Sequence, residues 1–518
     1  MAILPRVAGS HAPLPFDDLY HWKRIAWSAG HFPRVLAFDA DRGLRGEWCP
    51  WPPLYDAALG GVARLFGMQT VLWLPALGVA LFAAALAGLT ARRFGLPAGA
   101  VAGVLVAAHP YLVPVSSVGA VDHHWAEPLL VTWILFLTCM GPVEGRRPRL
   151  PRERRPEGQA RAPLLHGSIL LGLAITTALF VQTALLVAAA LAFVAVFFVL
   201  DEPRRGAIAF AIPALAVAVY RLAQPAGYPS NPWFLGWPHV AVLAAAAVAC
   251  AVRARGANRI VALAAGALCV APVLPGILAG ARFFGGDPWL ESITEFQPMF
   301  RDAGAIGTDL ASLTGGALLV LAIARRHRVV ALFAISYLLL ALTSHRFLVP
   351  AVPLFALAAA IAVSEMKTRG RMVAAVAVAL LPTLAYDFYA VWQPAEAEDS
   401  TRAIAAAVAA LPPGRVLAPW SFGHAIDVLG HHPVVLDNFG SMPDPDTFEE
   451  GTRALLSTRE DELVRWCRAH AVRYVVFTET PRIATSAASL GMPLEPRTTV
   501  WWRIMRGHGE PFRIVAIP

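Results

Sequence analysis

The most prominent pattern in the chain is a succession of apolar spans between residues 68 and 391, separated by short polar turns. A helix needs about 20 apolar residues, with a lower limit near 17, to cross the hydrocarbon core of a bilayer. The pattern therefore predicts a polytopic α-helical membrane protein with about 12 transmembrane helices. We place the spans at residues 68–91, 97–117, 124–142, 164–181, 182–200, 206–222, 238–252, 260–280, 306–324, 329–343, 347–365 and 372–391.

Arginine and lysine are distributed unevenly among the turns. Six alternate turns hold twenty of these residues, whereas the intervening turns and their flanks hold four. Because Lys and Arg of short loops stay on the cytoplasmic side, we assign the six basic turns to the cytosol. Twelve crossings in this orientation place both termini on the external, periplasmic side of the cell inner membrane. The basic turns are residues 92–93, 146–161, 204–205, 253–259, 325–328 and 367–371.

The chain divides into three parts. Residues 1–67 form an external N-terminal segment, and residues 68–391 form the transmembrane domain. We expect no signal peptide or first helix before residue 67. Residues 392–518 mix charges, Pro and Gly with short apolar runs, which predicts a small external α/β domain with its own core. In it we expect helices at 402–411 and 461–470 and buried strands at 415–418, 433–436 and 472–477.

Composition agrees with a protein whose partner is the lipid bilayer. Hydrophobic residues make up 57% of the chain and charged residues 15%, with a mean hydropathy of +0.56. An ordinary soluble domain does not bury so large an apolar fraction. The net charge of +8 could suggest nucleic acid, but about half of the positive residues lie in the cytosolic turns, where they orient helices. We therefore expect no nucleic-acid partner.

Four polar motifs fall on the external side of this topology, and none has a counterpart on the cytosolic side. They are Phe16–His21 in the N-terminal segment, Val121–Glu127 at the start of the third span, Ser292–Pro298 in the loop after the eighth, and Ser344–Phe347 before the eleventh. Ionisable residues at membrane depth are costly, so residues at span ends snorkel, form pairs or serve a function.

The motif around Asp122 suggests a cation site, because Asp122 and His124 can converge in a non-helical turn and Glu127 lies one helical turn below His124. Carboxylate and imidazole ligands suit Mn²⁺ or Mg²⁺ in a mixed site, with Asp17 as a second carboxylate. Each residue also has a simpler interpretation. Asp122 can cap a helix, Asp17 and Glu295 can be solvated, and Arg346 can snorkel to the interface. Together the motifs supply the parts needed to hold a metal and a phosphorylated ligand.

In their order and on their side of the membrane, these motifs resemble those of the catalytic subunit of oligosaccharyltransferase, especially its archaeal and bacterial single-chain forms. The resemblance implies metal ligation by Asp17, Asp122 and His124. It implies that His123 and Arg346 bind the diphosphate of a lipid-linked oligosaccharide. It also implies that Glu295, in Ser292–Glu295, contacts the acceptor amide of a polypeptide. The catalytic residues would then be Asp17, Asp122 and Glu295.

Two features depart from that family. Its members usually have thirteen helices, so this chain resembles the same plan without the first helix. The family's Trp-Trp-Asp-Tyr-Gly sequence, which recognises the acceptor Ser/Thr, corresponds here to Pro419–Gly423, with Trp420, Ser421 and Phe422 at the acceptor-binding positions. A site without the acceptor carboxylate should discriminate a hydroxyl side chain poorly.

The expected activity is transfer of an oligosaccharide from a polyprenyl diphosphate to a protein acceptor, with asparagine as the expected residue. The metal would assist departure of the lipid diphosphate. The first alternative is another C-type glycosyltransferase with a lipid-linked donor and a lipid, polysaccharide or Ser/Thr acceptor. The second alternative is a transporter or non-catalytic polytopic protein. Transporters place their binding residues near the bilayer midplane, however, and here the ionisable residues gather at one face.

Overall fold

The computed structural model describes residues 13, 16–140, 157–280, 286–301, 320, 323–368, 370–377, 380–381, 400–507 and 509–518. The predicted spans 306–324 and 372–391 fall largely outside these residues.

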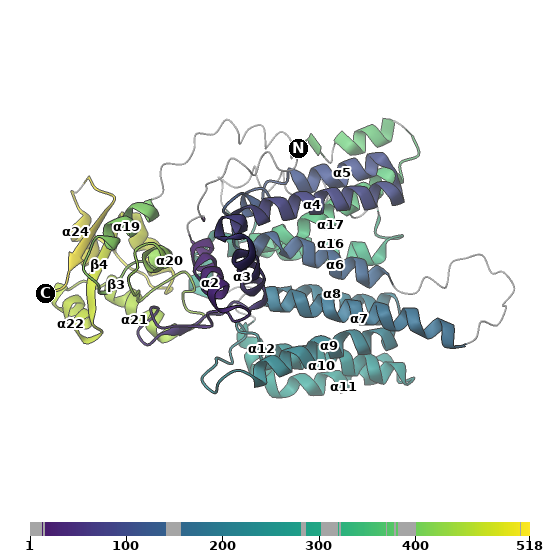
Figure 1. Ribbon diagram of the computed structural model, residues 1–518, viewed down its shortest axis with the longest axis horizontal. Coiled ribbons are helices and arrows are strands. Elements are labelled where there is room, and N and C mark those ends of the chain that lie inside the picture. Colours follow the sequence, from purple (N-terminus) through teal and green to yellow (C-terminus); the bar gives the residue numbers. More distant parts are fainter. Residues whose placement is uncertain are drawn as a thin grey trace.

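A bundle of helices forms the larger part of the molecule, and its helices run side by side along the long dimension (Figure 1). In chain order the bundle contains α4 (Met68–Phe94), α5 (Leu96–Ala107), α6 (Glu127–Cys139), α7 (Glu157–Val181), α8 (Leu186–Val194), α9 (Pro203–Leu222), α10 (Trp237–Ala254), α11 (Arg259–Val270), α12 (Leu274–Gly280), α16 (Arg328–Thr343) and α17 (Leu348–Ser364). Short turns named η2 (His123–Trp125), η3 (Thr183–Leu185), η4 (Ala195–Val199), η5 (Ala271–Val273) and η8 (His345–Phe347) extend several of them.

Five helical segments are long and apolar enough to cross a membrane: Met68–Phe94, Pro203–Leu222, Trp237–Ala254, Arg259–Leu278 and His345–Ser364. Each of the ten predicted spans within the described part of the chain contains a helix. The helix in the predicted span 97–117 is shorter than expected and ends at Ala107. Pro110 follows closely, and the residue before a proline is disfavoured in helical conformation. The total of about 12 spans stays a prediction.

Helix α17 lies at the centre of the bundle, where it packs against α5, α16 and α6. About nine tenths of its apolar window is buried (89%). Ala351, Ala356 and Ala360 are almost completely covered. Small side chains let neighbouring backbones approach closely, which is how helices associate when lipid removes the hydrophobic driving force. The end of α17 that carries η8 is therefore held rigidly.

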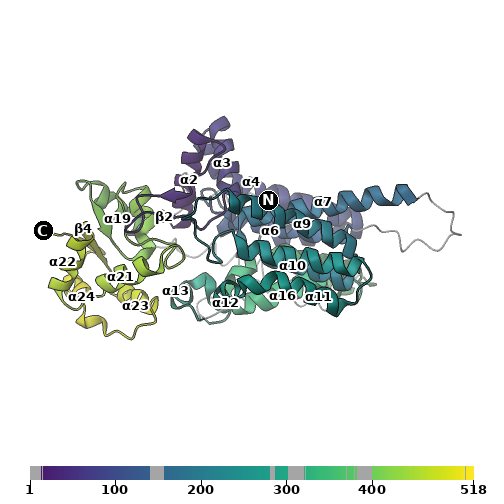
Figure 2. The ribbon, with the colours of Figure 1, turned by 90° about the horizontal axis from the view of Figure 1, so that it is seen from below.

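The N-terminal segment contains two helices for which the sequence analysis assigned no element. They are α2 (Asp17–His31) and α3 (Leu54–Phe66), joined by a small antiparallel pair, β1 (Phe38–Asp39) with β2 (Glu47–Trp48). Helix α2 begins with Asp17 and Asp18, and acidic residues in a first turn are favoured by the helix dipole. Both helices lie between the bundle and the C-terminal residues (Figures 1 and 2).

Residues 400–518 contain a three-stranded sheet in the order β3 (Arg415–Leu417), β4 (Val472–Thr478) and β5 (Phe512–Ala516). Strand β4 runs parallel to β3 and antiparallel to β5. The surrounding elements are α19 (Ser400–Ala409), η9 (Trp420–Phe422), α20 (Gly423–Val428), α21 (Pro445–Leu455), α22 (Glu460–Ala469), α23 (Pro481–Ala488), η10 (Pro496–Thr498) and α24 (Val500–Met505).

Two details of this part differ from the sequence analysis. The predicted strand 433–436 makes only isolated bridges, from Val434 to Arg42 and Val416, because Pro433 has no N–H with which to extend a ladder. Strand β5 was not predicted, since it is half-exposed and interrupted by Arg513.

Buried charges join the N-terminal segment to the C-terminal residues. Lys23 on α2 lies 2.7 Å from Asp39 and 2.8 Å from Asp427. Arg42 is fully buried and pairs with Asp437 and, at 3.1 Å, with Glu47. A buried charge without its partner is strongly destabilising, so these pairs favour one docking geometry. The C-terminal residues are thereby held over the end of the bundle that carries η2 and η8 (Figure 1).

Candidate active site

A cavity of about 860 Å³ opens where α2, the end of the bundle and the C-terminal residues meet. Its wall contains Asp17 and Asp18 from α2, the segment Asp122–His124, Glu295 and Arg346. Residues more than 300 positions apart in the sequence thus face one space. All four external motifs contribute to it.

Asp122 is the centre of the polar cluster on the bundle side. It caps η2 by accepting a hydrogen bond from the backbone N–H of His123 at 2.5 Å, so the capping interpretation is confirmed. The same carboxylate also has side-chain partners. Its Oδ1 lies 3.1 Å from His21 Nε2, and its Oδ2 lies 3.2 Å from His124 Nε2. The backbone N–H of Asp122 donates to Asp18 Oδ1 at 2.9 Å.

A second chain of contacts joins three motifs across the cavity. His124 Nδ1 lies 3.0 Å from Glu127 Oε1, the predicted neighbour one turn below. Arg346 lies 3.5 Å from Glu127 and donates to Glu295 at 2.9 Å. The Ser344 hydroxyl donates to the Glu295 carbonyl at 3.1 Å, which holds the loop against η8. The motif residues therefore form one connected polar surface.

Protonation states follow from burial and from these neighbours. Burial and the charge of Asp122 raise the pKa of Asp18 well above its usual value. Burial alone would raise the pKa of Asp122, but the charges of His123 and His124 hold it well below its ordinary value. Burial alone would lower the pKa of His21, but the carboxylates of Asp56 and Asp122 raise it to about 9. These surroundings therefore favour the charged form of Asp122 and the neutral form of Asp18.

The predicted metal ligands are brought together only in part. Asp122 Oδ2 and His124 Nε2 are close enough to share a cation, and their oxygen and nitrogen atoms suit a divalent ion. Asp17 lines the same cavity, but its carboxylate lies 3.5 Å from His424 Nδ1. Within the described residues, two groups of potential metal ligands lie close together, namely His21 with Asp122 and His123, and His123 with His124 and Glu127. Asp17 belongs to neither group.

The sequence analysis assigned no role to several polar residues that the structure places in or beside the site. His21 was part of a quoted motif, and its position one helical turn after Asp17 and Asp18 was the available signal. Gln182 contacts His123 and stands in the turn between two apolar spans. His424 is fully buried between Tyr20 and Phe439, directly after the Trp420 motif.

Of the predicted acceptor-binding residues on η9, only two reach the cavity. Trp420 and Ser421 line it, whereas Phe422 is buried in the core of the C-terminal residues. Trp289, on the short helix α13 (Pro288–Glu291), packs edge-on against Trp420 with ring centroids 6.1 Å apart. The loop that carries Glu295 is thus anchored to the C-terminal residues.

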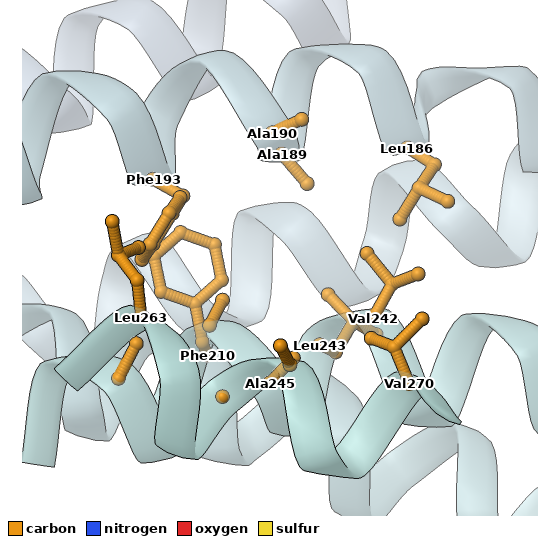
Figure 3. A pocket seen from close by; sticks show the side chains of 14 residues that line it. Leu186, Ala189, Ala190, Phe193, Phe210, Val242, Leu243, Ala245, Leu263 and Val270 are labelled. Atoms are coloured by element: carbon orange, nitrogen blue, oxygen red, sulfur yellow. The ribbon is translucent and has the colours of Figure 1, made fainter. Parts of the chain in front are cut away.

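An apolar crevice of about 270 Å³ adjoins the cavity between α8, α9, α10 and α11 (Figure 3). Its lining consists of alanine, leucine, valine, phenylalanine and glycine. Leu186, Ala190 and Val242 line both spaces, so the crevice continues the cavity into the bundle. A cavity with a polar cluster on one wall and an apolar extension matches an amphipathic ligand.

Comparison with known proteins gives matches in structure only. No protein-family model matches the chain, and no curated protein matches its sequence. The archaeal oligosaccharyltransferase AglB from Archaeoglobus fulgidus, solved with an inhibitory peptide and a dolichol-phosphate, matches with a TM-score of 0.73 and 16% identity, covering 94% of this chain and 70% of that one. The same enzyme tethered to an acceptor peptide with the NVT sequon gives a TM-score of 0.72 at 16% identity, covering 95% and 70%. Its complex with Zn and sulfate gives 0.67 at 16% identity, covering 95% and 69%. This chain therefore has the fold of an archaeal oligosaccharyltransferase.

Proposed function

We propose that the protein is a membrane glycosyltransferase that moves an oligosaccharide from a polyprenyl diphosphate to a polypeptide, at an asparagine side chain. The observation that carries this proposal is the convergence of the four external motifs on one cavity. The complexes of the archaeal enzyme with a dolichol-phosphate and with a sequon peptide support a lipid donor and a peptide acceptor.

The donor would bind with its diphosphate near Arg346 and His123 and its lipid tail in the apolar crevice. Arg346 is a fixed cation whose side chain is only 10% exposed, and a guanidinium matches phosphate oxygens in geometry. A positive charge held in a water-poor site stabilises the charge that develops on a leaving diphosphate. The crevice shares Leu186, Ala190 and Val242 with the cavity that holds the polar cluster, so one amphipathic molecule could occupy both.

Asp122 and His124 would hold a divalent cation, Mn²⁺ or Mg²⁺, with Asp17 as a further ligand. When bound, such an ion supplies a Lewis acid for the departing diphosphate. The chain contributes the geometry, because His21 contacts the Asp122 carboxylate, Asp18 accepts a hydrogen bond from the Asp122 backbone N–H, and Glu127 orients the His124 ring.

The acceptor would approach from the side of Trp420 and Ser421, opposite the donor. Glu295 would then orient and polarise the attacking amide, since its side chain is 41% exposed and faces the cavity. Positioning the two substrates in one cavity removes much of the entropic barrier to a bimolecular transfer.

We further propose the membrane placement predicted from charge: about 12 spans in the cell inner membrane, with the active site and an α/β domain of residues 392–518 on the periplasmic side. The five helices long enough to cross a bilayer support it. The ionisable residues of the cavity lie at the bundle end next to the C-terminal residues, as an external active site requires.

The test uses the purified full chain in nanodiscs with a labelled lipid-linked oligosaccharide and a sequon peptide. Wild-type protein should transfer the glycan, and Asp122→Asn should abolish transfer without lowering membrane expression, because ligand charge is lost while shape is kept. The matched control is Asp446→Asn, on an acidic side chain of α21 in the C-terminal residues. Near-normal transfer by Asp122→Asn, or donor uptake into vesicles without transfer, would contradict the proposal.

One observation favours a second acceptor class. On η9, the cavity wall carries Trp420 and Ser421, so this segment presents no carboxylate to a Ser/Thr hydroxyl. The acceptor could then be a lipid, a polysaccharide or a hydroxyl side chain. Offering these acceptors beside the sequon peptide, in the same nanodisc assay, distinguishes the two.

A further inference from the structure

Three side-chain atoms converge within the cavity wall, at the contact between α2 and η2. His21 Nε2, His123 Nδ1 and Asp122 Oδ1 lie 2.6 to 3.1 Å from one another. His21 is 1% exposed, His123 2% and Asp122 9%. Two imidazole nitrogens and one carboxylate oxygen therefore point at a common position that the protein screens from solvent.

The other ring nitrogen of His21, Nδ1, has the kind of hydrogen-bond partner that metal-binding histidines have. Its Nδ1 lies 2.6 Å from the carboxylate of Asp56, which itself pairs with Arg24 at 2.5 Å. Histidine ligands of metals almost always donate their second N–H to a carboxylate, a carbonyl or water, which sets tautomer and orientation. The indole of Trp51 also stacks on the His21 ring, with centroids 3.8 Å apart and planes 3° from parallel.

The far side of the His123 ring is held in the same way. Its Nε2 lies 2.5 Å from the side-chain amide of Gln182 and 3.5 Å from the carboxylate of Glu127. The Glu127 carboxylate can accept a hydrogen bond from Nε2, which would leave the lone pair of Nδ1 directed at Asp122 and His21, whereas Gln182 approaches Nε2 with its amide nitrogen. Both rings are thus oriented from outside toward the same point.

We propose that His21, His123 and Asp122 bind a divalent cation of the zinc class in a buried site within the cavity wall. Two nitrogen ligands and one carboxylate favour a borderline ion such as Zn²⁺ over Mg²⁺, which prefers oxygen ligands. The site is distinct from the cavity-facing pair, because it uses Oδ1 of Asp122 whereas His124 faces Oδ2. It does not depend on the proposed transfer reaction, but it would leave His123 no free ring nitrogen for the donor diphosphate, which would then rest on Arg346.

Such an ion would act on the active site through Asp122. With Oδ1 held in the buried site, the carboxylate is fixed in the rotamer that presents Oδ2 to His124 and the cavity. The ion would also join α2 to η2, two segments 102 residues apart at His21 and His123. The rival explanation is a clamp without metal, in which a proton on His21 Nε2 alone balances the charge of Asp122.

The experiment measures metal binding by the full chain in detergent, after removal of metal with a chelator. Titration with Co²⁺, a spectroscopic substitute for Zn²⁺, should give visible d–d absorption that Zn²⁺ abolishes, and in His124→Asn, which lacks the cavity-facing pair, this absorption should saturate at one ion per chain. Asp56→Asn keeps the shape of the second ligand shell and should weaken binding about 10- to 100-fold. His21→Asn should abolish the absorption.

Two control variants separate the alternatives. His432→Asn alters another buried histidine, in the C-terminal residues, and should bind Co²⁺ like the wild type. His124→Asn should also retain the band, because it alters only the cavity-facing side of Asp122. Absence of stoichiometric Co²⁺ binding, or a band lost in His124→Asn and kept in His21→Asn, would overturn the proposal. Since the readout is absorption, failure of glycan transfer leaves this result unaffected.

Discussion

The ion pair between Arg346 and Glu295 leads to a prediction with two opposite effects. The pair is 2.9 Å long, and Glu295 is 41% exposed whereas the guanidinium is almost covered. A donor diphosphate that binds Arg346 must displace the Glu295 carboxylate. The substitution Glu295→Gln removes this competition and keeps the size of the side chain.

The magnitude follows from the exposure of the pair. Ion pairs open to solvent contribute about 0.2 to 1 kcal/mol, since water screens them. Because 1.4 kcal/mol corresponds to tenfold in affinity, removing the competitor should tighten donor binding by up to about fivefold. Transfer should instead slow by about 100-fold or more, because the acceptor amide loses the carboxylate that polarises it.

The assay combines two measurements on protein in nanodiscs. Binding of a fluorescent short-chain polyprenyl diphosphate reports donor affinity, and single-turnover transfer to a sequon peptide reports the chemical step. The control is Glu291→Gln, a carboxylate of the same loop that accepts a hydrogen bond from the Gly286 N–H. Weaker donor binding in Glu295→Gln, or the same response in Glu291→Gln, would refute the reasoning.

Three further predictions concern other parts of the molecule. Gly440→Ala should lower the thermal stability of the C-terminal residues by about 1 to 3 kcal/mol, because the new Cβ would lie 2.0 Å from the Trp289 ring at a φ of +53°; an unchanged melting temperature would contradict this. Burial raises the pKa of Asp427 to about 6. The folded state therefore binds that proton more tightly, and the free energy of unfolding should fall as pH rises from about 4 to 6, a slope that Asp427→Asn should remove in thermal melts. Ala189→Phe should fill the crevice and weaken binding of a long-chain donor but not of a short-chain one.

Much of the architecture follows from local sequence. Hydropathy predicted the helices α4, α9 and α10, because the apolar composition of each window is visible in the sequence. That composition does not depend on what the helix packs against. The external motifs were selected because ionisable residues next to apolar spans stand out in the sequence. The contact of His124 with Glu127 was also predictable, since it depends only on helical spacing.

The helices of the N-terminal segment and strand β5 were harder to predict. Helix α3 is amphipathic and α2 begins with two acidic residues, but neither is apolar throughout. Such elements are stabilised mainly by the surfaces they bury, here against each other and the C-terminal residues. A pattern within one segment does not reveal that partner.

Sequence by itself determined the helices of the bundle that lie in the described residues and the four motifs that line the cavity, and it predicted the sidedness from arginine. Only the tertiary structure decided which atoms of those motifs meet: His21 rather than Asp17 at Asp122 Oδ1, Asp17 beside His424, and Trp289 against Gly440. The physical reason is the separation along the chain over which each interaction acts. Hydropathy, charge and helical spacing act between near neighbours in the chain, whereas these contacts join residues up to about 400 positions apart and arise from the packing of whole elements.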